Sequence, residues 1–512
     1  MIDHTMQEDF NYLISILNAP VYDVAVKTPL DTLSRLSERF GSRILLKRED
    51  MQPSFSFKVR GAYTLMVRLS SDELARGVVT ASAGNHAQGV ALAAHTLGCK
   101  ARVFMPHTTP EIKVQAVKRY GAEVVLCGDN FDDACDAALA DAREKGSTFV
   151  PPFDHPHVIA GQGTVGMEIL QQTTQLDAIF VPIGGGGLAA GICAYVKRVK
   201  PQIKIFGVEP SDADSMSQAL AGGAPVRLAH VGRFCDGVAV RQVGAYSYKL
   251  CEQYLDGIVR VNNDEVCAAI KDVFVDTRSI LEPSGALSLA GLKAWRQREQ
   301  KGATLVAIAS GANMNFDQLR YIAERSTIGE NREARFAVSI AEHPGSFRSL
   351  MERLGECVVT AFDYRRTTGS AAQVFVGVQT YGAESARKIV EDLGAAGYRA
   401  TDLGGSTLWR THGHQLVGTD TFDVEREKLF EVMFPERRGA LLEFLRKLED
   451  EWDISLFHYR NEGFDYGRVL IGIRCDRADS ARLYSALEAT RFEFSEQTDA
   501  SPYLALLHDE RR

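Results

Sequence analysis

The sequence lacks any run of about 20 apolar residues, so no segment of it is expected to span a membrane. Its nine cysteines are scattered and never form a Cys-x-x-Cys pair, which favours reduced thiols, and no metal site is expected. There is no basic block, and 58 Lys and Arg against 66 Asp and Glu give a formal net charge of −8, so nucleic acid is not an expected partner. The N-terminus has neither the apolar core of a signal peptide nor the arginines of a transit peptide, and a cytoplasmic location is expected.

The composition, with 45% hydrophobic and 24% charged residues, is typical of globular proteins, and 512 residues exceed what one core accommodates. Over the first 325 residues, apolar runs of strand length alternate with helical patterns. This alternation predicts an α/β domain with a doubly wound parallel sheet, whose ligands bind beyond the carboxyl ends of the strands. Strands are predicted at 101–105, 123–127, 178–183, 203–208 and 304–309, and helices at 111–120, 131–144 and 164–172.

Lys58 lies in the partly apolar segment Ser56-Phe57-Lys58-Val59-Arg60-Gly61-Ala62. Burial of an amine disfavours its charged form and lowers its pKa, and a neutral amine is what Schiff-base chemistry with a carbonyl requires. The alternative is a lysine whose stem packs on apolar neighbours while its head reaches water. Two further segments favour the chemical interpretation.

Each of these segments joins an apolar run to a helical pattern through glycine. The first is Ser82-Ala83-Gly84-Asn85-His86, where amides at a helix N-terminus are suited to a carboxylate. The second is Gly184-Gly185-Gly186-Gly187-Leu188, where four glycines predict a nest of N–H groups for a phosphate. This loop lacks the Lys-Ser/Thr of a P-loop and the spacing of a dinucleotide fingerprint. A lysine for a carbonyl, a nest for a phosphate and Asn85 for a ring together fit a phosphorylated aldehyde.

Two other polar positions follow predicted strands. Ser310 ends the run 304–309, so it is expected at the ligand-binding edge of the sheet, and a helix N-cap is the alternative. The carboxylates of the segment 209–214 also follow a strand. We expect that segment to be a solvated loop rather than a cation site.

From about residue 326 the pattern changes to an internal repeat. Its first copy has strand runs at 336–340 and 360–365 around a helix ending at Leu354. Its second has runs at 429–434 and 456–460 around a helix ending at Leu448. Each copy continues with a strand, a helix and a last strand, which predicts two ferredoxin-like βαββαβ modules of α+β class. The predicted domains are 1–325, 334–405 and 427–505, and the simplest role for the modules is oligomerisation.

Five motifs in this order resemble those of fold-type II pyridoxal 5′-phosphate (PLP) enzymes. They are Lys47-Arg48-Glu49 with the Lys58 segment, the Asn85 loop, the four-glycine loop, Glu282-Pro283-Ser284-Gly285-Ala286, and Ala309-Ser310-Gly311-Ala312-Asn313. Residues 25–325 resemble that catalytic fold, and the whole chain resembles the biosynthetic threonine dehydratases (threonine ammonia-lyases).

The resemblance implies a role for each candidate residue. Lys58 would form the Schiff base with PLP beside Phe57, and Asn85 would face the cofactor 3′-oxygen. Gly184 to Gly187, with Leu188, would hold the phosphate, and Ser310 would face the pyridine nitrogen. The substrate carboxylate would bind Ser82, Ala83, Gly84, Asn85 and His86.

The implied reaction is β-elimination of L-threonine to 2-oxobutanoate and ammonia, the first step of isoleucine biosynthesis. Lys58 would remove the Cα proton, and L-serine would react likewise to give pyruvate. The repeat resembles a tandem pair of ACT-like regulatory modules, with L-isoleucine as inhibitor, L-valine as opposing ligand, and a homotetramer as the assembly. Tyr364 and Tyr459 are the candidate effector residues. Arg438 stands where the first copy has Pro344, which predicts a different strand-to-helix turn.

Three alternatives are weighed against this reaction. Racemases of this fold use a serine just before the Gly-Asn pair, and Ala83 at that position disfavours racemisation. Threonine synthase needs sites for a phosphorylated substrate and lacks the tandem C-terminal pair. An amino-acid sensor with a vestigial catalytic half is disfavoured because Lys58, Asn85 and Ser310 are intact.

Overall fold

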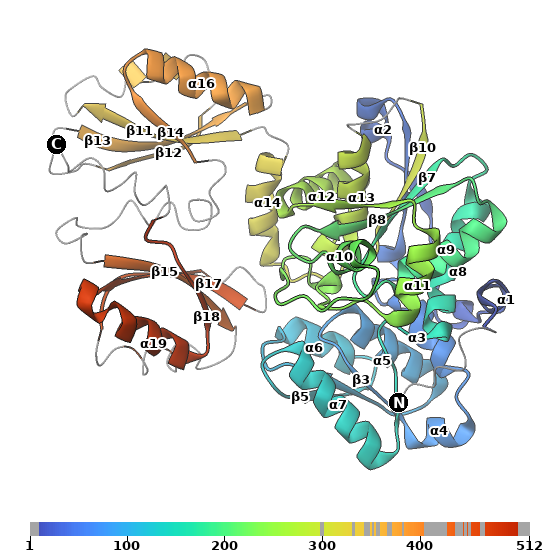
Figure 1. The fold of residues 1–512 in the computed structure, drawn as a ribbon. Coiled ribbons are helices and arrows are strands. Elements are labelled where there is room, and N and C mark those ends of the chain that lie inside the picture. The colour runs from blue at the N-terminus through green and yellow to red at the C-terminus, as the bar shows by residue number, and fades with distance from the viewer. Residues whose placement is uncertain are drawn as a thin grey trace. The chain divides into compact units, whose positions relative to one another are not determined.

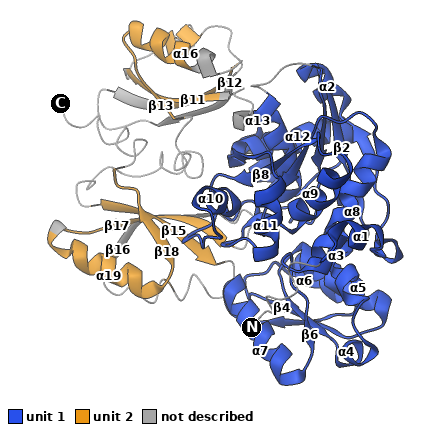
Figure 2. Cartoon of the chain, turned by 45° about the vertical axis from the view of Figure 1, so that its right-hand side comes forward, with its two compact units in different colours: residues 1–326 blue, residues 327–512 orange. Residues whose placement is uncertain are grey.

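The computed structural model describes residues 10–296, 302–329, 333–341, 349–350, 353–354, 359–365, 371–380, 383–403, 427–435, 444, 448, 452–460 and 466–499. The side chains of 359–365 and 453–460 lie outside this description. The chain divides into two compact units, Met1–Ser326 and Thr327–Arg512 (Figure 2). Each unit is described by itself.

The larger sheet of the first unit has six strands, and all neighbouring pairs are parallel except the edge pair β1–β2. The central strand β7 is buried at every residue because helices cover both faces of the sheet. Helices α8, α9 and α11 contribute to the core on one face, while α13 packs against β7 to β10 (Figure 1). In sheet order the strands are β1 (Leu30–Thr32), β2 (Arg43–Lys47), β10 (Thr304–Ile308), β7 (Ala178–Pro182), β8 (Lys204–Pro210) and β9 (Gly257–Val261).

A second, smaller sheet of the same unit has four parallel strands. In sheet order they are β5 (Glu123–Leu126), β4 (Ala101–Met105), β3 (Val78–Ala81) and β6 (Thr148–Phe149). Side chains of α3, α5 and α6 form the core on one face, and α7 packs on the other. The predicted parallel α/β architecture is confirmed, with its strands divided between two sheets.

Fourteen α-helices are described in or at the end of this unit. They are α1 (Tyr12–Leu17), α2 (Ser34–Phe40), α3 (Lys58–Met66), α4 (Ser71–Arg76), α5 (Asn85–Leu97), α6 (Glu111–Lys118), α7 (Phe131–Lys145), α8 (Pro156–Gln172), α9 (Gly187–Val199), α10 (Ser215–Gly222), α11 (Ala245–Tyr254), α12 (Asn263–Thr277), α13 (Pro283–Arg296) and α14 (Gln318–Gly329). Short 3₁₀ turns are η2 (Val21–Asp23), η3 (Glu49–Met51) and η4 (Asp236–Val238). No helix in the described part of the chain is long and apolar enough to cross a bilayer.

Helix α8 begins at Pro156, eight residues before the predicted start at 164. Its glycines hide the helical pattern in the sequence but allow neighbouring helices to approach closely. A Cβ on Gly161 would lie 2.5 Å from the Arg60 carbonyl of α3, and one on Gly163 would lie 2.8 Å from the Gly191 carbonyl of α9. The early part of α8 is therefore a packing surface for the helices that carry Lys58 and the four-glycine loop.

The second unit contains two separate four-stranded antiparallel sheets. Their orders, β12-β13-β11-β14 and β16-β17-β15-β18, are the same when the strands are numbered within each copy. This is the predicted repeat of ferredoxin-like modules, and the prediction is confirmed. The elements are β11 (Glu333–Ala341), β12 (Val359–Arg365), β13 (Ala371–Gln379), α16 (Ala383–Ala395), β14 (Arg399–Asp402), β15 (Glu427–Pro435), β16 (Asp453–Arg460), β17 (Tyr466–Arg474), α19 (Ser480–Thr490) and β18 (Glu493–Glu496), with the 3₁₀ turn η6 (Arg477–Asp479).

The candidate effector tyrosines occupy equivalent backbone positions in the two modules. Tyr364 of β12 pairs with Val374, and Tyr459 of β16 pairs with Val469. Their side chains lie outside the described part of the structure, as do Pro344 and Arg438.

Candidate active site

Lys58 is the first residue of α3 and is half-buried. Its Nζ donates a hydrogen bond of 2.9 Å to the Pro152 carbonyl and lies 5.3 Å from the centroid of the Phe57 ring. Removal from water lowers the pKa of this amine to about 8, although the nearby Glu282 carboxylate acts in the opposite direction. The depressed pKa predicted from the sequence is confirmed, and its cause is burial.

Two close approaches of the backbone hold Lys58 in place. A Cβ on Gly89 would lie 3.0 Å from the Val59 nitrogen, so glycine lets α5 pack more closely on the start of α3 than a larger residue would. On the other side, the Phe57 N–H donates to the Ser310 carbonyl at 3.3 Å. The end of β10 therefore lies beside Lys58, as expected for a ligand-binding edge.

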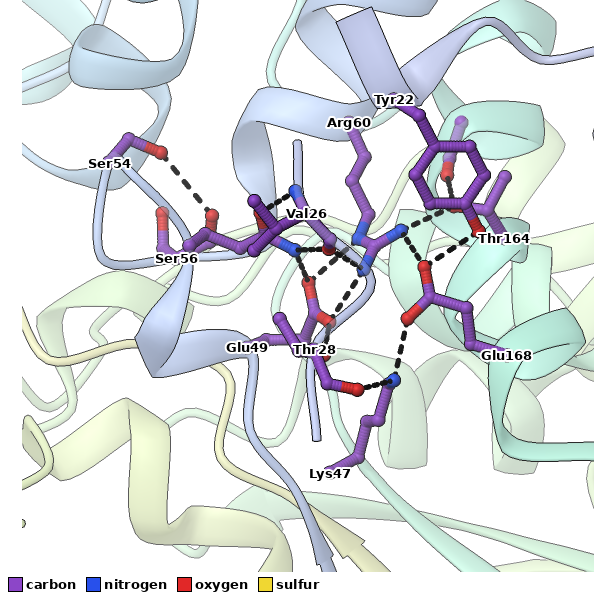
Figure 3. A network of polar contacts seen from close by, with 12 residues as sticks. Tyr22, Val26, Thr28, Lys47, Glu49, Ser54, Ser56, Arg60, Thr164 and Glu168 are labelled. Carbon is purple, nitrogen blue, oxygen red and sulfur yellow. Dashed lines mark hydrogen bonds and ion pairs between the residues drawn. The ribbon is translucent and has the colours of Figure 1, made fainter. Parts of the chain in front are cut away.

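A fully buried ionic network surrounds the Arg60 side chain of α3 (Figure 3). Arg60 forms ion pairs of 2.8 Å with Glu49 and 2.7 Å with Glu168, and Glu168 also pairs with Lys47 at 2.6 Å. All four side chains have no exposed surface, and two cations balance two carboxylates. The network joins α3 to α8 and to the end of β2. Lys47, Glu49 and Arg60 all lie in the motifs named above, but no pattern in the sequence predicts that their side chains pair.

The four glycines follow β7 and lead into α9. A Cβ on Gly185 would lie 2.2 Å from the Phe153 ring, one on Gly184 2.9 Å from Val238 Cα, and one on Gly187 2.8 Å from the Phe153 carbonyl. Gly186 has a φ of +93°, which favours glycine as well. Side chains are therefore excluded at every position of the loop, and the buried Leu188 anchors it in the core.

This loop presents unused hydrogen-bond donors. No hydrogen bond between described residues uses the main-chain N–H groups of Gly184, Gly185 or Gly186. They stand at the N-terminus of the 13-residue helix α9, where the helix dipole favours an anion. The arrangement fits the phosphate of PLP. Pro152 and Phe153 link it to Lys58, since Pro152 accepts from the amine and Phe153 packs on the glycines.

A second set of donors lies at the N-terminus of α5. Ser82 Oγ accepts the Gly84 N–H at 3.2 Å, and Ser82, Ala83, Gly84 and Asn85 are half-buried. His86 is buried instead, and its Nε2 lies 2.9 Å from the Val150 carbonyl. Burial, together with the nearby Lys58 amine, lowers the pKa of His86 to about 3, so its ring is neutral at physiological pH.

Ser310 follows β10 and is almost completely buried. Its hydroxyl donates to the Ser284 carbonyl at 3.1 Å. The buried Ser284 hydroxyl has no hydrogen-bond partner among the described residues. A buried hydroxyl without a partner is costly, which is consistent with a polar group of a cofactor binding there.

Asn85 joins α5 to Glu282 and Asn313, two motif residues to which no role was assigned from the sequence. Its Nδ2 donates to Glu282 Oε1 at 2.5 Å, and its Oδ1 accepts from Asn313 Nδ2 at 2.8 Å. Burial, reinforced by Asp236, raises the pKa of Glu282 to about 7. Glu282 and Asn313 were both visible in quoted motifs, but only their contacts reveal that they hold Asn85.

The segment 209–214 is not the solvated loop that we expected. Glu209 and Asp214 are buried, and the Glu209 carboxylate accepts the N–H groups of Met216 and Ser217, both at 2.8 Å. It therefore binds the first turn of α10, while Asp212 is exposed. Among the residues described, no group of three or more His, Cys, Asp or Glu side chains is arranged to hold a metal ion.

Comparison with known families assigns both parts of the chain. Residues 21–311 match the pyridoxal-phosphate-dependent enzyme family. Residues 324–412 and 420–507 each match the C-terminal regulatory domain of threonine dehydratase.

Individual relatives agree with this assignment. The biosynthetic L-threonine dehydratase of Pasteurella multocida is 48% identical over 494 residues, 96% of either chain. The solved threonine deaminase isoform 2 of Solanum lycopersicum, in its processed form, is 50% identical with a TM-score of 0.61, covering 62% of this chain and 92% of its own. Maize serine racemase is 30% identical with a TM-score of 0.58, covering 60% and 95%.

The structure brings Lys58, Asn85, the four glycines and Ser310 into one connected set of contacts. The lysine has a depressed pKa. Among the residues that the structure describes, the N–H donors of the glycine loop and one buried hydroxyl have no hydrogen-bond partner. All of these features fit PLP. The similarity to threonine dehydratases extends through both regulatory modules, whereas the similarity to the racemase covers 60% of the chain. The chain therefore belongs to the PLP-dependent biosynthetic threonine dehydratases.

Proposed function

We propose that the protein converts L-threonine to 2-oxobutanoate and ammonia by β-elimination, as the first step of isoleucine biosynthesis. The observation that carries the proposal is the Lys58 amine, whose pKa is lowered to about 8 and which contacts Pro152 next to the phosphate-binding glycine loop. Similarity to biosynthetic threonine dehydratases over 96% of the chain supports threonine as the substrate.

The roles of the chain's own residues follow from their positions. Bound PLP supplies a conjugated ring that stores the negative charge left when the Cα–H bond breaks. The N–H groups of Gly184 to Gly187 hold its phosphate, with Leu188 anchoring the loop, and Phe57 packs beside Lys58. Asn85 would donate to the 3′-oxygen of the ring. Ser310 faces the pyridine nitrogen.

Lys58 acts at the reacting carbon. Its neutral amine is the base that removes the Cα proton of the substrate. The substrate carboxylate is held by N–H groups of the Ser82–His86 loop, which leads into the N-terminus of α5. Loss of that proton and of the Cβ hydroxyl removes water from threonine, and hydrolysis then releases ammonia. L-Serine lacks one methyl group, worth about 1–3 kcal/mol of discrimination, so it reacts as a second substrate to give pyruvate.

The proposed domains are a catalytic domain at 1–325 and ACT-like regulatory modules at 334–405 and 427–505. We propose that L-isoleucine inhibits the reaction and that L-valine opposes this inhibition. Tyr364 and Tyr459 line the proposed effector sites. Two family matches to threonine dehydratase regulatory domains and the equivalent register of the two tyrosines support this proposal. A cytoplasmic homotetramer is the proposed working form.

The first test is 2-oxobutanoate formation from L-threonine by the PLP-loaded protein, with and without L-isoleucine. Turnover that isoleucine suppresses supports both the reaction and the regulation. Turnover that isoleucine does not change contradicts the effector assignment but not the reaction. A PLP-loaded protein that leaves threonine unchanged would contradict the reaction.

A control variant isolates the chemical role of Lys58. Lys58→Ala is expected to abolish the visible absorbance of the covalently held cofactor while the far-UV circular dichroism is unchanged. Retention of that absorbance in the folded variant would remove Lys58 from its proposed role.

A further inference from the structure

Asn313 contacts Asn85 from the loop after β10 and has no role in the reaction proposed above. Its Nδ2 donates to the Ser54 carbonyl and to Asn85 Oδ1, both at 2.8 Å. Its main-chain N–H donates to the Glu282 carboxylate. Asn313 thus contacts both Asn85 and the carboxylate that accepts from the Asn85 amide.

The Ser54 main-chain carbonyl determines which atoms of these amides donate and which accept. A carbonyl oxygen such as that of Ser54 can only accept, so the side-chain atom of Asn313 that faces it must be the NH₂ group. The same NH₂ faces Asn85, so the Asn85 atom it meets must be the amide oxygen. The NH₂ of Asn85 is then turned toward Glu282. The orientation of both amides follows from one carbonyl.

Of the four N–H bonds in the side-chain amides of Asn313 and Asn85, one has no acceptor among the described residues. The two N–H bonds of the Asn313 amide are taken by Ser54 and Asn85. One N–H of the Asn85 amide is taken by Glu282, and the other has no acceptor among the described residues. It is the donor that the proposed function directs at the cofactor 3′-oxygen. If the Asn85 amide were flipped, its oxygen would face the cofactor 3′-oxygen, and no hydrogen bond could form.

Glu282 alone does not determine the orientation of Asn85. Burial and Asp236 raise its pKa to about 7, so near neutral pH a fraction of the carboxyl groups carry a proton. A protonated carboxyl offers a donor as well as an acceptor and tolerates either end of an amide. The Ser54 carbonyl does not titrate. Gly311 leaves room for the contact, since a Cβ there would lie 2.4 Å from Glu282 Oε1 and 3.0 Å from Asn85 Nδ2.

We infer that Asn313 is a positioning residue, which transmits the polarity of the Ser54 carbonyl to Asn85 and so keeps an N–H donor facing the cofactor ring. This inference rests on the proposed function, because it assumes that Asn85 meets the cofactor 3′-oxygen. It assigns a role to the last residue of the Ala309-Ser310-Gly311-Ala312-Asn313 motif.

The test compares Asn313→Asp with Asn315→Asp in the full chain. Asp at 313 keeps the size of the side chain but cannot donate to Ser54 or Asn85. Asn315 lies two residues further along the same loop, and its Oδ1 accepts the Asp317 N–H at 3.3 Å, a contact that Asp retains.

Two measurements serve as readouts. They are equilibrium dialysis of PLP against the apo forms and the visible spectrum of the loaded forms without substrate. Asn313→Asp is expected to weaken PLP binding by about tenfold and to shift the absorbance maximum, because one hydrogen bond to a charged oxygen is lost. Asn315→Asp is expected to leave both unchanged.

Because a buried aspartate can destabilise the fold, Asn313→Ala provides a second variant without the charge. A double-mutant cycle with Asn85→Ala separates positioning from general damage. If Asn313 acts through Asn85, Asn313→Ala weakens PLP binding in the wild-type background and has no further effect when Asn85 is already alanine. Additive losses, or normal spectra and affinities in both Asn313 variants, would overturn the inference while leaving the proposed function intact. Failure of the wild-type protein to acquire any visible absorbance with PLP would remove both.

Discussion

At the scale of single residues, the chemistry of Lys58 depends on its surroundings more than on its identity. The same side chain in water is almost fully charged at neutral pH, and burial beside Phe57 and Pro152 brings its pKa to about 8. His86 shows the same effect, since its pKa of about 3 keeps the ring neutral next to the lysine. His86 therefore adds no positive charge beside the Lys58 amine.

The depressed pKa of Lys58 predicts how the apoenzyme takes up PLP. Only the neutral amine attacks the cofactor aldehyde. Below the pKa, the neutral fraction grows by about tenfold for each unit that the pH rises, and above the pKa it levels off. The rate of covalent attachment, followed by stopped-flow absorbance, is therefore expected to rise up to about pH 8 and then level off. An Nα-blocked lysine in solution serves as the control, because its rate should keep rising toward a pH of about 10.4, the ordinary pKa of the side chain. A protein rate that follows the free amine would contradict the burial of Lys58.

At the scale of elements, α3 is held by charges as well as by apolar packing. Arg60 pairs with Glu49 and Glu168, so α3 is tied to the 3₁₀ turn η3, which follows β2, and to α8. Removing one partner of a buried ion pair leaves an uncompensated charge, which is far more costly than losing an exposed pair. The position of Lys58, two residues before Arg60, therefore depends on this network.

The network predicts unequal effects for two substitutions. Glu168→Gln leaves Lys47 and Arg60 facing the single carboxylate of Glu49, and it is expected to lower the free energy of unfolding by about 3 kcal/mol or more. Arg227→Ala removes a pair with Asp132 in which both side chains are exposed, and a change within about 0.5 kcal/mol is expected. Urea unfolding followed by circular dichroism measures both. Equal effects of the two substitutions would show that the buried charges contribute no more than surface ones.

At the scale of the whole molecule, the two units have separate hydrophobic cores, and the modules of the second unit each have their own. The residues proposed for catalysis all lie in the first unit, and the proposed effector residues all lie in the second.

This separation predicts the behaviour of a shortened chain. Residues 1–329, which keep α14 whole, are expected to bind PLP and to turn over threonine within about tenfold of the full chain, because every contact described around Lys58 remains. Their activity should no longer respond to L-isoleucine. Steady-state assays of both forms, with and without isoleucine, measure the difference. A shortened chain that is still inhibited by isoleucine would place the effector site in the first unit.

Some differences between sequence-based expectation and structure have a common cause. Gly161 and Gly163 obscured the first two turns of α8, yet they are the reason it packs closely on its neighbours. Glu209 looked like part of a solvated acidic loop, yet it binds the amides of α10. In both cases the expectation rested on how that residue type usually behaves, whereas a contact with another segment gives the residue a different role.

The sequence by itself determined the features that are carried by neighbouring residues. These are the Lys58 segment, the two glycine loops, Ser310 after its strand and the C-terminal repeat, since periodicity and motifs are local properties of the chain. Only the tertiary structure decided which side chains meet. Asn85 and Asn313 are 228 positions apart, and Arg60 and Glu168 are 108 apart. Hydrogen bonds and ion pairs form only within a few ångströms, so their partners are set by how the segments pack, and no pattern along the chain encodes that distance.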